Sequence, residues 1–322
     1  MPDKSISRRQ FLSVAGLAAL AVSGACTTLQ APGTPAVQKK RSLRIAHLTD
    51  FHVYAGGGAP EGMANALRHA QSQPDRPDFI LNTGDSIMDS LEADKAQTEA
   101  QWELFNKIFE EEGKLPVYHA IGNHDVWGWG RQDPQMQSDP LYGKAMALKM
   151  LELPERYYSF NRAGWHFIVL DSTHLPNEVS QYPYIGQLDE EQFTWLEKDI
   201  AAAGSETPIC IASHIPILCA CEFLDGPNEQ TGNWVVPAAW MHLDARRFRQ
   251  LFLQHPNIRL CLSGHAHQHE SLDYLGVRYM TDGAVCGNWW NGAYMDFPPA
   301  YVLVDLYEDG TAESTFVPYE QA

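Results

Sequence analysis

Residues 43–52 read LRIAHLTDFH, an apolar run of strand length followed at once by polar residues. A short apolar run bounded by polar residues is typical of a buried strand. Runs of the same kind recur along the chain, and helical patterns such as Trp102, Phe105 and Phe109 lie between them. The sequence therefore predicts an alternating α/β fold, with strands at residues 43–48, 79–82, 116–121, 166–170, 209–212 and 258–262.

The pattern changes after residue 267, where short strands joined by turns replace the alternation. We predict these strands at residues 271–274, 277–281, 301–306 and 312–318, so that the chain closes in antiparallel sheet. Two loops rich in glycine and proline, 126–140 and 215–242, are longer than a connection requires. They are candidates to face a substrate, with surface insertion as the alternative.

Most of the predicted strands in the alternating part end in a side chain that can bind a metal or move a proton. In an alternating α/β sheet, ligand sites form at the carboxyl edge of the strands. Five such segments occur in order: Asp50-Phe51-His52, Gly84-Asp85, Gly122-Asn123-His124-Asp125, Ser213-His214 and Gly264-His265-Ala266-His267. One polar residue after a strand is ordinary, because polar residues commonly start loops. Five in succession predict one shared site.

The spacing within two of these segments suggests a geometry. In an extended backbone side chains alternate, so Asp50 and His52 would point to the same side. His265 and His267 have the same spacing, although a splayed loop could aim them at different ions. Carboxylate oxygens and imidazole nitrogens without a nearby cysteine suit Mn, Fe, Zn or Co better than a thiolate cluster does.

The ordered set of five segments resembles the calcineurin-like metallophosphoesterase superfamily, from residue 43 to the end of the chain. The resemblance implies an α/β fold in which a two-layer mixed β-sandwich is flanked by helices, in the order αββα. It also implies two transition-metal ions, divalent or trivalent, that share one aspartate. Asp50, His52, Asp85 and His267 would hold one ion, and Asp85, Asn123, His214 and His265 the other.

Two departures from the family pattern indicate which branch the chain resembles. Met88 stands where the family usually has another aspartate, and we expect Asp89, which follows it, to contact the ligands at most. Purple acid phosphatases carry a tyrosine at the Met88 position and usually lack the histidine of the first motif, so Met88 and His52 argue against them. Gly186-x-Leu188 and Gln192-x-x-Trp195-Leu196 fit the phosphodiesterase-like branch.

The resemblance predicts a hydrolase of phosphate esters, with phosphodiesters favoured over monoesters. Two cations about 3.5–4 Å apart can clamp a phosphoryl group and lower the pKa of a water between them, so a metal-bridging hydroxide would attack. His124 is the candidate general acid for the leaving oxygen. Asp125 would orient His124 or hold a neighbouring loop. The substrate would be a small-molecule or lipid phosphoester, whose identity the sequence leaves open.

Two other functions stay open from the sequence. Gly84-Asp85-Ser86 resembles the nucleophile segment of small lipases, which would make Ser86 the nucleophile of a serine esterase. The same metal ligands would also serve an envelope protein that binds metal without catalysis.

Several residues near the motifs have competing interpretations. His47 and His119 lie within predicted strands, and we expect them in the core or beside the ligands. His269 follows the last motif and is expected on an exposed strand. Trp289 and Trp290 would either cover a substrate or pack in the C-terminal sheet.

Residues 1–25 are typical of an export signal, because Arg8 and Arg9 precede an uncharged stretch at 11–25. The segment 7–12, SRRQFL, resembles the twin-arginine type, which implies the twin-arginine translocon as a partner. Cys26 follows small residues that suit either soluble release or lipid anchoring at Cys26. Residues 26–42 predict a tether. We expect a metallophosphoesterase domain at 43–322, located in the periplasm or cell envelope and anchored to the membrane if Cys26 is lipidated.

The composition of the 322 residues limits the classes of protein and of partner. A hydrophobic fraction of 44% excludes a mostly disordered chain. The chain has 40 acidic and 23 basic residues, a net charge of -17, which argues against binding a nucleic-acid duplex. Five of the six cysteines follow Cys26, and we expect them to be free thiols rather than a disulfide framework.

Overall fold

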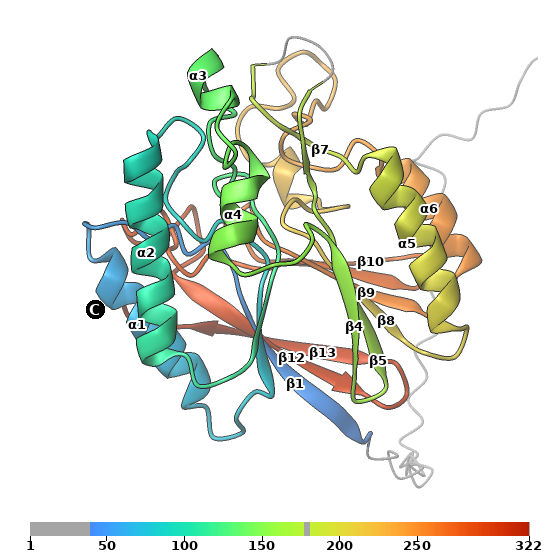
Figure 1. The fold of residues 1–322 in the computed structure, drawn as a ribbon. Coiled ribbons are helices and arrows are strands. Elements are labelled where there is room, and N and C mark those ends of the chain that lie inside the picture. The colour runs from blue at the N-terminus through green and yellow to red at the C-terminus, as the bar shows by residue number, and fades with distance from the viewer. Residues whose placement is uncertain (1–38, 177–180, 322) are drawn as a thin grey trace, which may run out of the picture. The chain divides into compact units, whose positions relative to one another are not determined.

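The computed structural model describes residues 39–176 and 181–321, which belong to one compact unit, Lys39–Ala322 (Figure 1). The predicted export signal at residues 1–25 lies outside the described residues. Only residues 39–42 of the predicted tether are described, and Arg41 already begins the first strand. The boundaries of signal, tether and domain therefore remain predictions.

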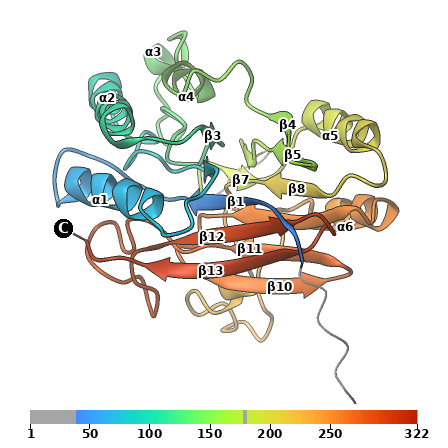
Figure 2. The same cartoon turned by 90° about the horizontal axis from the view of Figure 1, so that it is seen from below.

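The first of two large sheets has five strands in the order β13-β12-β1-β2-β3. Three of them, β1 (Arg41–Leu48), β2 (Phe79–Asn82) and β3 (Val117–His119), run parallel, with Ile45 opposite Phe79 and Ile80 opposite Val117. The C-terminal strand β12 (Ala300–Tyr307) pairs antiparallel with β1, and β13 (Ala312–Pro318) pairs antiparallel with β12. The end of the chain therefore completes the sheet that the first strand begins (Figure 2).

The second large sheet has six strands in the order β10-β11-β9-β8-β5-β4. Parallel pairing joins β5 (Trp165–Val169), β8 (Ile209–Ala212), β9 (Ile258–Ser263) and β11 (Val277–Thr281). The edge strands β4 (Tyr158–Arg162) and β10 (Glu270–Tyr274) pair antiparallel with their neighbours. The expectation of purely antiparallel pairing after residue 267 is wrong for β11, because the β10–β11 hairpin places β11 beside β9 in the same direction. The sequence also gave no prediction for β4 or for the short pair β6 (Thr173–His174) and β7 (Ile185–Gly186).

The two sheets pack face to face because their strands alternate apolar side chains between two faces. In β1, Leu43 and Ile45 join an apolar cluster between the sheets, whereas Ala46 and Leu48 point to the opposite face. Residues of the second sheet, such as Phe167, belong to the same inter-sheet cluster. The rings of Phe79 and Phe167 meet there edge to face, with centroids 5.6 Å apart.

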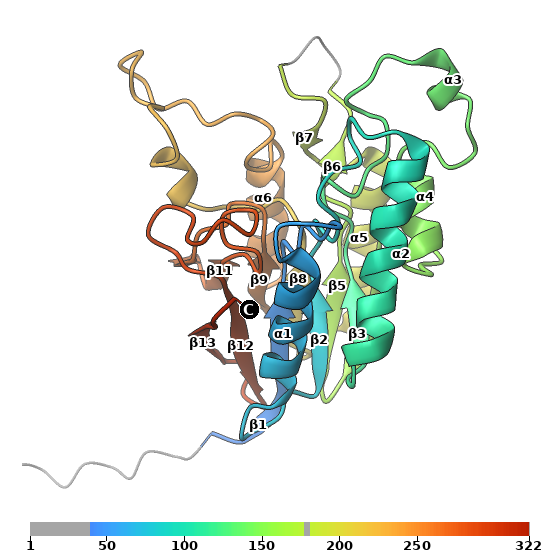
Figure 3. The ribbon, with the colours of Figure 1, turned by 90° about the vertical axis from the view of Figure 1, so that its left-hand side faces the viewer.

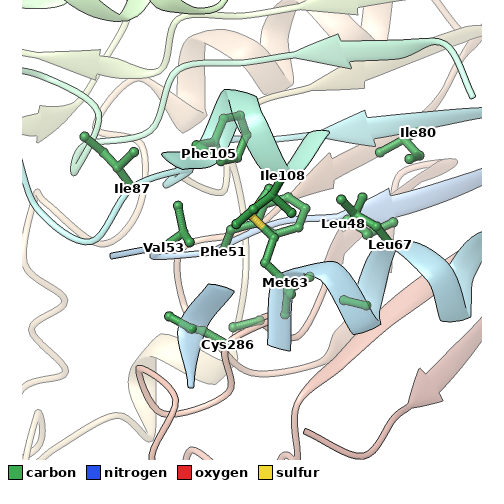
Figure 4. Packing of buried hydrophobic residues seen from close by; sticks show 14 of the residues in the cluster. Leu48, Phe51, Val53, Met63, Leu67, Ile80, Ile87, Phe105, Ile108 and Cys286 are labelled. Atoms are coloured by element: carbon green, nitrogen blue, oxygen red, sulfur yellow. The ribbon is translucent and has the colours of Figure 1, made fainter. Parts of the chain in front are cut away.

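Helices cover the outer face of each sheet. The helices α1 (Ala59–Gln71) and α2 (Lys95–Glu112) pack Met63, Phe105 and other apolar side chains against the first sheet (Figure 4). Asp94 starts α2 with a reciprocal capping box with Gln97. The helices α5 (Glu190–Ala203) and α6 (Ala245–Gln254) cover the second sheet through Phe193 and Phe248. Figure 3 shows α1 and α2 in front of the strands of the first sheet. The predicted αββα sandwich is confirmed.

Short helices and loops complete the described part of the chain. They are α3 (Pro134–Gln137), α4 (Lys144–Met150) and the 3-10 turn η1 (Cys221–Phe223). In the described ranges, no helix combines the length and the apolar character needed to cross a membrane. The five described cysteines are buried free thiols, as predicted: Cys210, Cys219, Cys221, Cys261 and Cys286.

Replacing Phe79 by alanine is expected to lower the free energy of unfolding by about 3–5 kcal/mol, because it empties a ring-sized volume between the sheets. Urea unfolding, followed by circular dichroism, measures the change. Leu253→Ala on α6 is the control, since Leu253 is 52% exposed and should shift stability by less than about 0.5 kcal/mol. Equal stability of Phe79→Ala and the native chain would contradict this packing.

Candidate active site

The polar segments that follow the strands come together at the carboxyl edge of the two sheets. The backbone there is not extended: Asp50, His52, His265 and His267 have φ angles of 55°, 43°, 72° and 55°. The predicted extended Asp-x-His geometry is therefore wrong. The alternative expected for His265 and His267, a splayed loop, is the one observed. Left-handed backbone is strained for residues with a side chain, and strain of this kind clusters at functional sites.

Hydrogen bonds between the motifs hold this strained backbone. The amide of Asp50 donates to the Gly84 carbonyl at 3.0 Å, and the amide of His52 donates to the Asp85 carbonyl at 3.0 Å. The amide of His265 donates to Asp50 Oδ2, also at 3.0 Å. Backbone amides therefore fix the first motif to the second through carbonyls, and the last motif to the first through the Asp50 carboxylate.

The glycines of three motifs are required by close packing against the carboxylates. A Cβ atom on Gly122 would lie 2.2 Å from Asp85 Oδ1, and one on Gly264 would lie 2.3 Å from Asp50 Oδ2. A Cβ atom on Gly84, whose φ is 113°, would lie 2.5 Å from the Gly122 amide nitrogen. Real side chains do not approach this closely, so only glycine fits these positions.

The first group of converging side chains consists of Asp50, His52, His267 and Asp85. The Nε2 atoms of His52 and His267 lie 3.1 Å apart. Asp50 Oδ1 lies 3.5 Å from His267 Nε2, and Asp85 Oδ2 lies 3.5 Å from His52 Nε2. All four residues are buried. Two nitrogens and two carboxylates therefore point at one small volume.

The second group consists of Asp85, Asn123, His214 and His265. His214 Nε2 lies 2.9 Å from Asn123 Oδ1, 3.2 Å from His265 Nδ1 and 3.2 Å from Asp85 Oδ2. Asp85 Oδ2 thus takes part in both groups, while Asp85 Oδ1 accepts the His124 amide at 2.8 Å. The seven residues predicted as ligands thus lie together at one edge of the sheets.

The outward nitrogen of each converging histidine faces a backbone carbonyl. His214 Nδ1 lies 3.1 Å from Thr83 O, His265 Nε2 lies 3.0 Å from Ala239 O and His267 Nδ1 lies 2.6 Å from Gly287 O. The corresponding distance from His52 Nδ1 to Met88 O is 3.4 Å. A ring that donates outward presents a lone pair inward, which is the tautomer that a metal requires. The residues therefore fit divalent metal ions of the kind that carboxylates and imidazoles bind. The expectation of no nearby cysteine is wrong, because Cys286 Sγ lies 3.9 Å from His267 Nδ1.

The protonation states of the histidines and carboxylates, without a metal bound, are also consistent with a site for a cation. Burial lowers the pKa of both His52 and His265 to about 3, so these rings are neutral. Burial opposes a charge on His214 as well, but Asp85 outweighs it and raises the pKa of His214 to about 9. Burial opposes ionisation of Asp85, yet His214 brings the pKa of Asp85 well below its usual value. A proton on His214 thus compensates carboxylates that a metal ion would neutralise.

His124 lies beside the two groups, and one of its ring nitrogens is within 4.8 Å of ligand atoms of His52 and Asp85. Its side chain is 27% exposed, its ring centroid is 4.8 Å from that of His52, and its Nδ1 is 3.7 Å from Asp89 Oδ1. Burial lowers the pKa of His124, but Asp85 and then Asp89 outweigh burial and raise that pKa above its usual value. His124 therefore lies at the edge of the site, with the Asp89 carboxylate near its Nδ1 atom.

Asp125 does not orient His124. Its Oδ1 accepts the amides of Ser86 and Ile87 at 2.8 and 3.3 Å, and its Oδ2 accepts the Gly122 amide at 2.9 Å. Both oxygens are thus used to hold the adjoining motif loops, the second of the two roles expected for it. The carboxylate beside His124 is Asp89, which we had expected only to contact a ligand.

Three further histidines lie apart from the two ligand groups, and the expectation of an exposed strand for His269 is wrong, because His269 precedes β10 and its side chain is 24% exposed. His47 Nδ1 is 2.5 Å from Asp282 Oδ2 and its Nε2 is 2.8 Å from Thr83 Oγ1, so His47 is a buried polar link. His119 Nδ1 lies 3.0 Å from Asn82 Nδ2. His269 stacks on Phe316 and its Nδ1 lies 3.3 Å from Asp282 Oδ1.

Ser86 is not placed as a nucleophile. It is fully buried, and its Oγ accepts a hydrogen bond from Asn82 Nδ2 at 3.0 Å. A serine esterase needs a histidine within hydrogen-bond distance of the nucleophile, and no described histidine is recorded in contact with Ser86 Oγ. The geometry therefore disfavours the serine esterase.

A cavity of about 240 Å³ lies over the converging side chains. Trp289 lines it and packs on His267 with ring centroids 4.5 Å apart, whereas Trp290 belongs to the core beneath α1 and α2. Of the two interpretations given for this pair, a position over the substrate fits Trp289 and packing in the core fits Trp290. Other lining residues were missed from the sequence: Tyr184, Glu222, Asp225, Trp240 and Tyr294. The only signal was the excess length of the loop at 215–242, which carries three of them.

Comparison with known proteins agrees with this geometry. The model of the calcineurin-like phosphoesterase family matches residues 43–269. A 3',5'-cyclic adenosine monophosphate phosphodiesterase of Escherichia coli, CpdA, is 24% identical over 280 residues, which cover 84% of this chain and 87% of that protein. A 3',5'-cyclic-nucleotide phosphodiesterase of Nostoc sp. is 24% identical over 290 residues, covering 85% of this chain and 92% of that protein.

Among solved structures, a dimetal phosphatase from Danio rerio matches with a TM-score of 0.58 at 15% identity, covering 87% of this chain and 100% of that chain. This likeness supports the fold. The chain belongs to the calcineurin-like phosphoesterase family. It is a metal-dependent phosphoesterase, and so a hydrolase.

Proposed function

We propose that the chain is a phosphodiesterase that works with two metal ions. The observation that carries the proposal is the position of Asp85 Oδ2, which lies 3.5 Å from His52 Nε2 on one side and 3.2 Å from His214 Nε2 on the other. One oxygen between two ligand groups is what a shared aspartate requires. Asp50, His52, Asp85 and His267 would hold one ion, and Asp85, Asn123, His214 and His265 the second.

Two divalent ions so bound supply charge neutralisation for the phosphoryl oxygens and activation of water. The residues of the chain set the geometry: the backbone carbonyls fix the histidine rings, and Asp125 holds the loops that present Asp85 and Asn123. A phosphate bound in the cavity would lie over the ligand groups and beside His124, since these residues line it.

His124 would act as the general acid. Its Nδ1 is near Asp89 Oδ1, at 3.7 Å, which leaves Nε2 for the leaving-group oxygen. A proton transferred from Nε2 converts the departing alkoxide into an alcohol. The position of His124 at the cavity wall, beside His52 and Asp85, supports this role.

Two observations favour a diester over a monoester. The cavity is lined by Glu222 and Asp225, and no lysine or arginine of the described chain lines it. The two negative charges of a phosphate monoester are repelled more strongly by these carboxyl groups than the single negative charge of a diester. The relatives from E. coli and Nostoc are named as phosphodiesterases.

The test is elemental analysis together with hydrolysis of bis-p-nitrophenyl phosphate and p-nitrophenyl phosphate by the same preparation. We expect about two metal ions per chain and faster hydrolysis of the diester. Treatment with a chelator, followed by removal of the chelator, should abolish both activities, and added Mn²⁺ or Zn²⁺ should restore them. Activity that survives complete removal of metal would contradict the proposal.

We also propose that the chain is exported, on the basis of residues 1–25. Fusing these residues to a reporter that is active only after export tests the assignment. Arg8→Lys with Arg9→Lys should block export if the route is the twin-arginine one. Cys26→Ser should release the protein from the membrane if Cys26 is lipidated.

A further inference from the structure

The lining of the cavity includes a buried carboxyl group that the proposed reaction does not use. Glu222 belongs to η1 and is 2% exposed, yet it lines the cavity. Its carboxyl group makes no recorded hydrogen bond to any side chain or amide of the described chain. The carboxyl oxygens are not among the described side-chain atoms that are both fully buried and unpartnered, so they reach the open cavity, where a ligand can supply the partner.

The position of Glu222 is fixed by its surroundings. Glu270 Oε1 accepts the amide of Ala220 at 2.8 Å, which anchors the start of η1. Asn228 Nδ2 donates to the carbonyls of Glu222 and Asp225 at 2.7 and 3.0 Å, which closes the turn after it. The carboxyl group is therefore presented by an ordered turn.

A second carboxylate and two aromatic rings complete this wall. Asp225 Oδ2 accepts a hydrogen bond from the Tyr294 hydroxyl at 3.0 Å. The rings of Tyr294 and Trp289 have centroids 5.7 Å apart and stand at 87° to each other, so they form a corner. Trp240 lines the same cavity. Aromatic faces together with carboxylates are the surroundings that an ammonium group prefers.

The charge of the wall also favours a cation. Burial, and then the neighbouring Asp225 and Glu270, raise the pKa of Glu222 to about 8 in the bare protein. A cationic ligand would stabilise the ionised form that burial opposes. No lysine or arginine in the described ranges lines the cavity, and the charge of His267, which lowers the pKa of Glu222, does not outweigh burial.

We infer that the substrate carries an ammonium group, primary or quaternary, joined to the phosphate through a short alcohol. The phosphate lies over the metal ligands, while the ammonium group contacts Glu222 and Asp225 in the corner formed by Trp289 and Tyr294. This inference rests on the proposed function, because it places the phosphate at the metal ligands. A neutral nucleoside substrate could stack on Trp289 but would leave the two carboxylates without a counter-charge.

The test compares esters that share one leaving group. Water cleaves the P–O bond to p-nitrophenol in p-nitrophenyl phosphocholine, p-nitrophenyl phosphoethanolamine and p-nitrophenyl ethyl phosphate, leaving the second ester bond intact. We expect kcat/KM to be at least about 10-fold higher for the two cationic esters. Glu222→Gln should remove most of this preference by lowering kcat/KM for the two cationic esters more than for the ethyl ester. Glu229→Gln, an exposed position on the same loop, is the control and should keep the preference.

The outcomes separate the two proposals. Absence of metal-dependent hydrolysis for all three esters would overturn the proposed function. Hydrolysis without a preference for the cationic esters would overturn only the ammonium inference. An equal loss for all three esters in Glu222→Gln would also overturn it, since the residue would then support the site as a whole.

A binding measurement provides a readout that does not depend on turnover. Choline and ethanolamine should quench the tryptophan fluorescence of the purified protein, and Glu222→Gln should weaken their binding about 10-fold. Equal binding to both proteins would overturn the inference.

The ammonium phosphodiester could be a soluble molecule or a membrane lipid, and paired substrates distinguish these two sources. Glycerophosphoethanolamine is compared with glycerophosphoglycerol in solution, and phosphatidylethanolamine vesicles with phosphatidylglycerol vesicles. Preference for the ammonium member in either pair supports the inference and identifies the source. Preference in neither pair overturns it.

Discussion

The Asp85→Asn variant is expected to lose about 1,000-fold or more in kcat/KM on a phosphodiester. Asp85 Oδ2 is the one oxygen placed between His52 Nε2 and His214 Nε2, so its loss affects both ligand groups at once. Several kcal/mol of transition-state stabilisation come from metal charge, and about 4 kcal/mol corresponds to 1,000-fold. Metal content, measured by elemental analysis, should fall together with activity.

The control for Asp85→Asn is Asp273→Asn on β10. Asp273 is 67% exposed at its side chain and pairs with Arg278 at the surface, so the control should keep both metal and activity. Circular dichroism should show that both variants are folded. If Asp85→Asn retained native activity, the shared position of this carboxylate would have no catalytic meaning.

The second large effect is expected for His124→Ala, and it should depend on the leaving group. General acid catalysis contributes about 100- to 10,000-fold when the leaving oxygen needs a proton. We expect a loss in this range for a diester with an alkyl alcohol as leaving group. The loss should be below about 10-fold for p-nitrophenyl esters, because p-nitrophenolate leaves without a proton.

Asp89→Asn and Asp125→Asn separate orientation from support of the loop. Asp89 is near His124 Nδ1, so Asp89→Asn should reduce activity on the alkyl ester by about 10- to 100-fold without a large change in stability. Asp125 accepts three backbone amides, so Asp125→Asn should instead lower the free energy of unfolding. Equal losses of His124→Ala on alkyl and aryl esters would contradict the acid role.

The sequence predicted the strands at the centre of each sheet well because their apolar runs are continuous. β2 and β8 have the predicted bounds, since both faces of these strands are buried. β4, which reads YSFNR, escaped prediction because its polar residues fit the edge of a sheet as well as a loop. The direction of β11 depends on which strand it lies beside, and periodicity carries no information on that pairing.

The sequence predicted those parts of the site that directly follow the ends of strands. The seven converging residues are encoded as short motifs at the carboxyl edge, where the fold brings them together. The left-handed backbone at Asp50 and His52 was missed, because two-residue spacing alone suggests an extended chain. The partner of His124 was also missed, because Asp89 comes from another loop. The acidic wall with Glu222 lies on a long loop, whose path is set by contacts such as Asn228 with the turn.

The glycines at 84, 122 and 264 have a consequence for how such a centre can change over generations. A single methyl group added at Gly264 would occupy the space of Asp50 Oδ2, and one added at Gly122 the space of Asp85 Oδ1. A one-atom change in one motif would therefore displace a carboxylate supplied by another. Close packing therefore couples the three glycines to the other motifs, so a larger residue at any of them would require a compensating change in another motif.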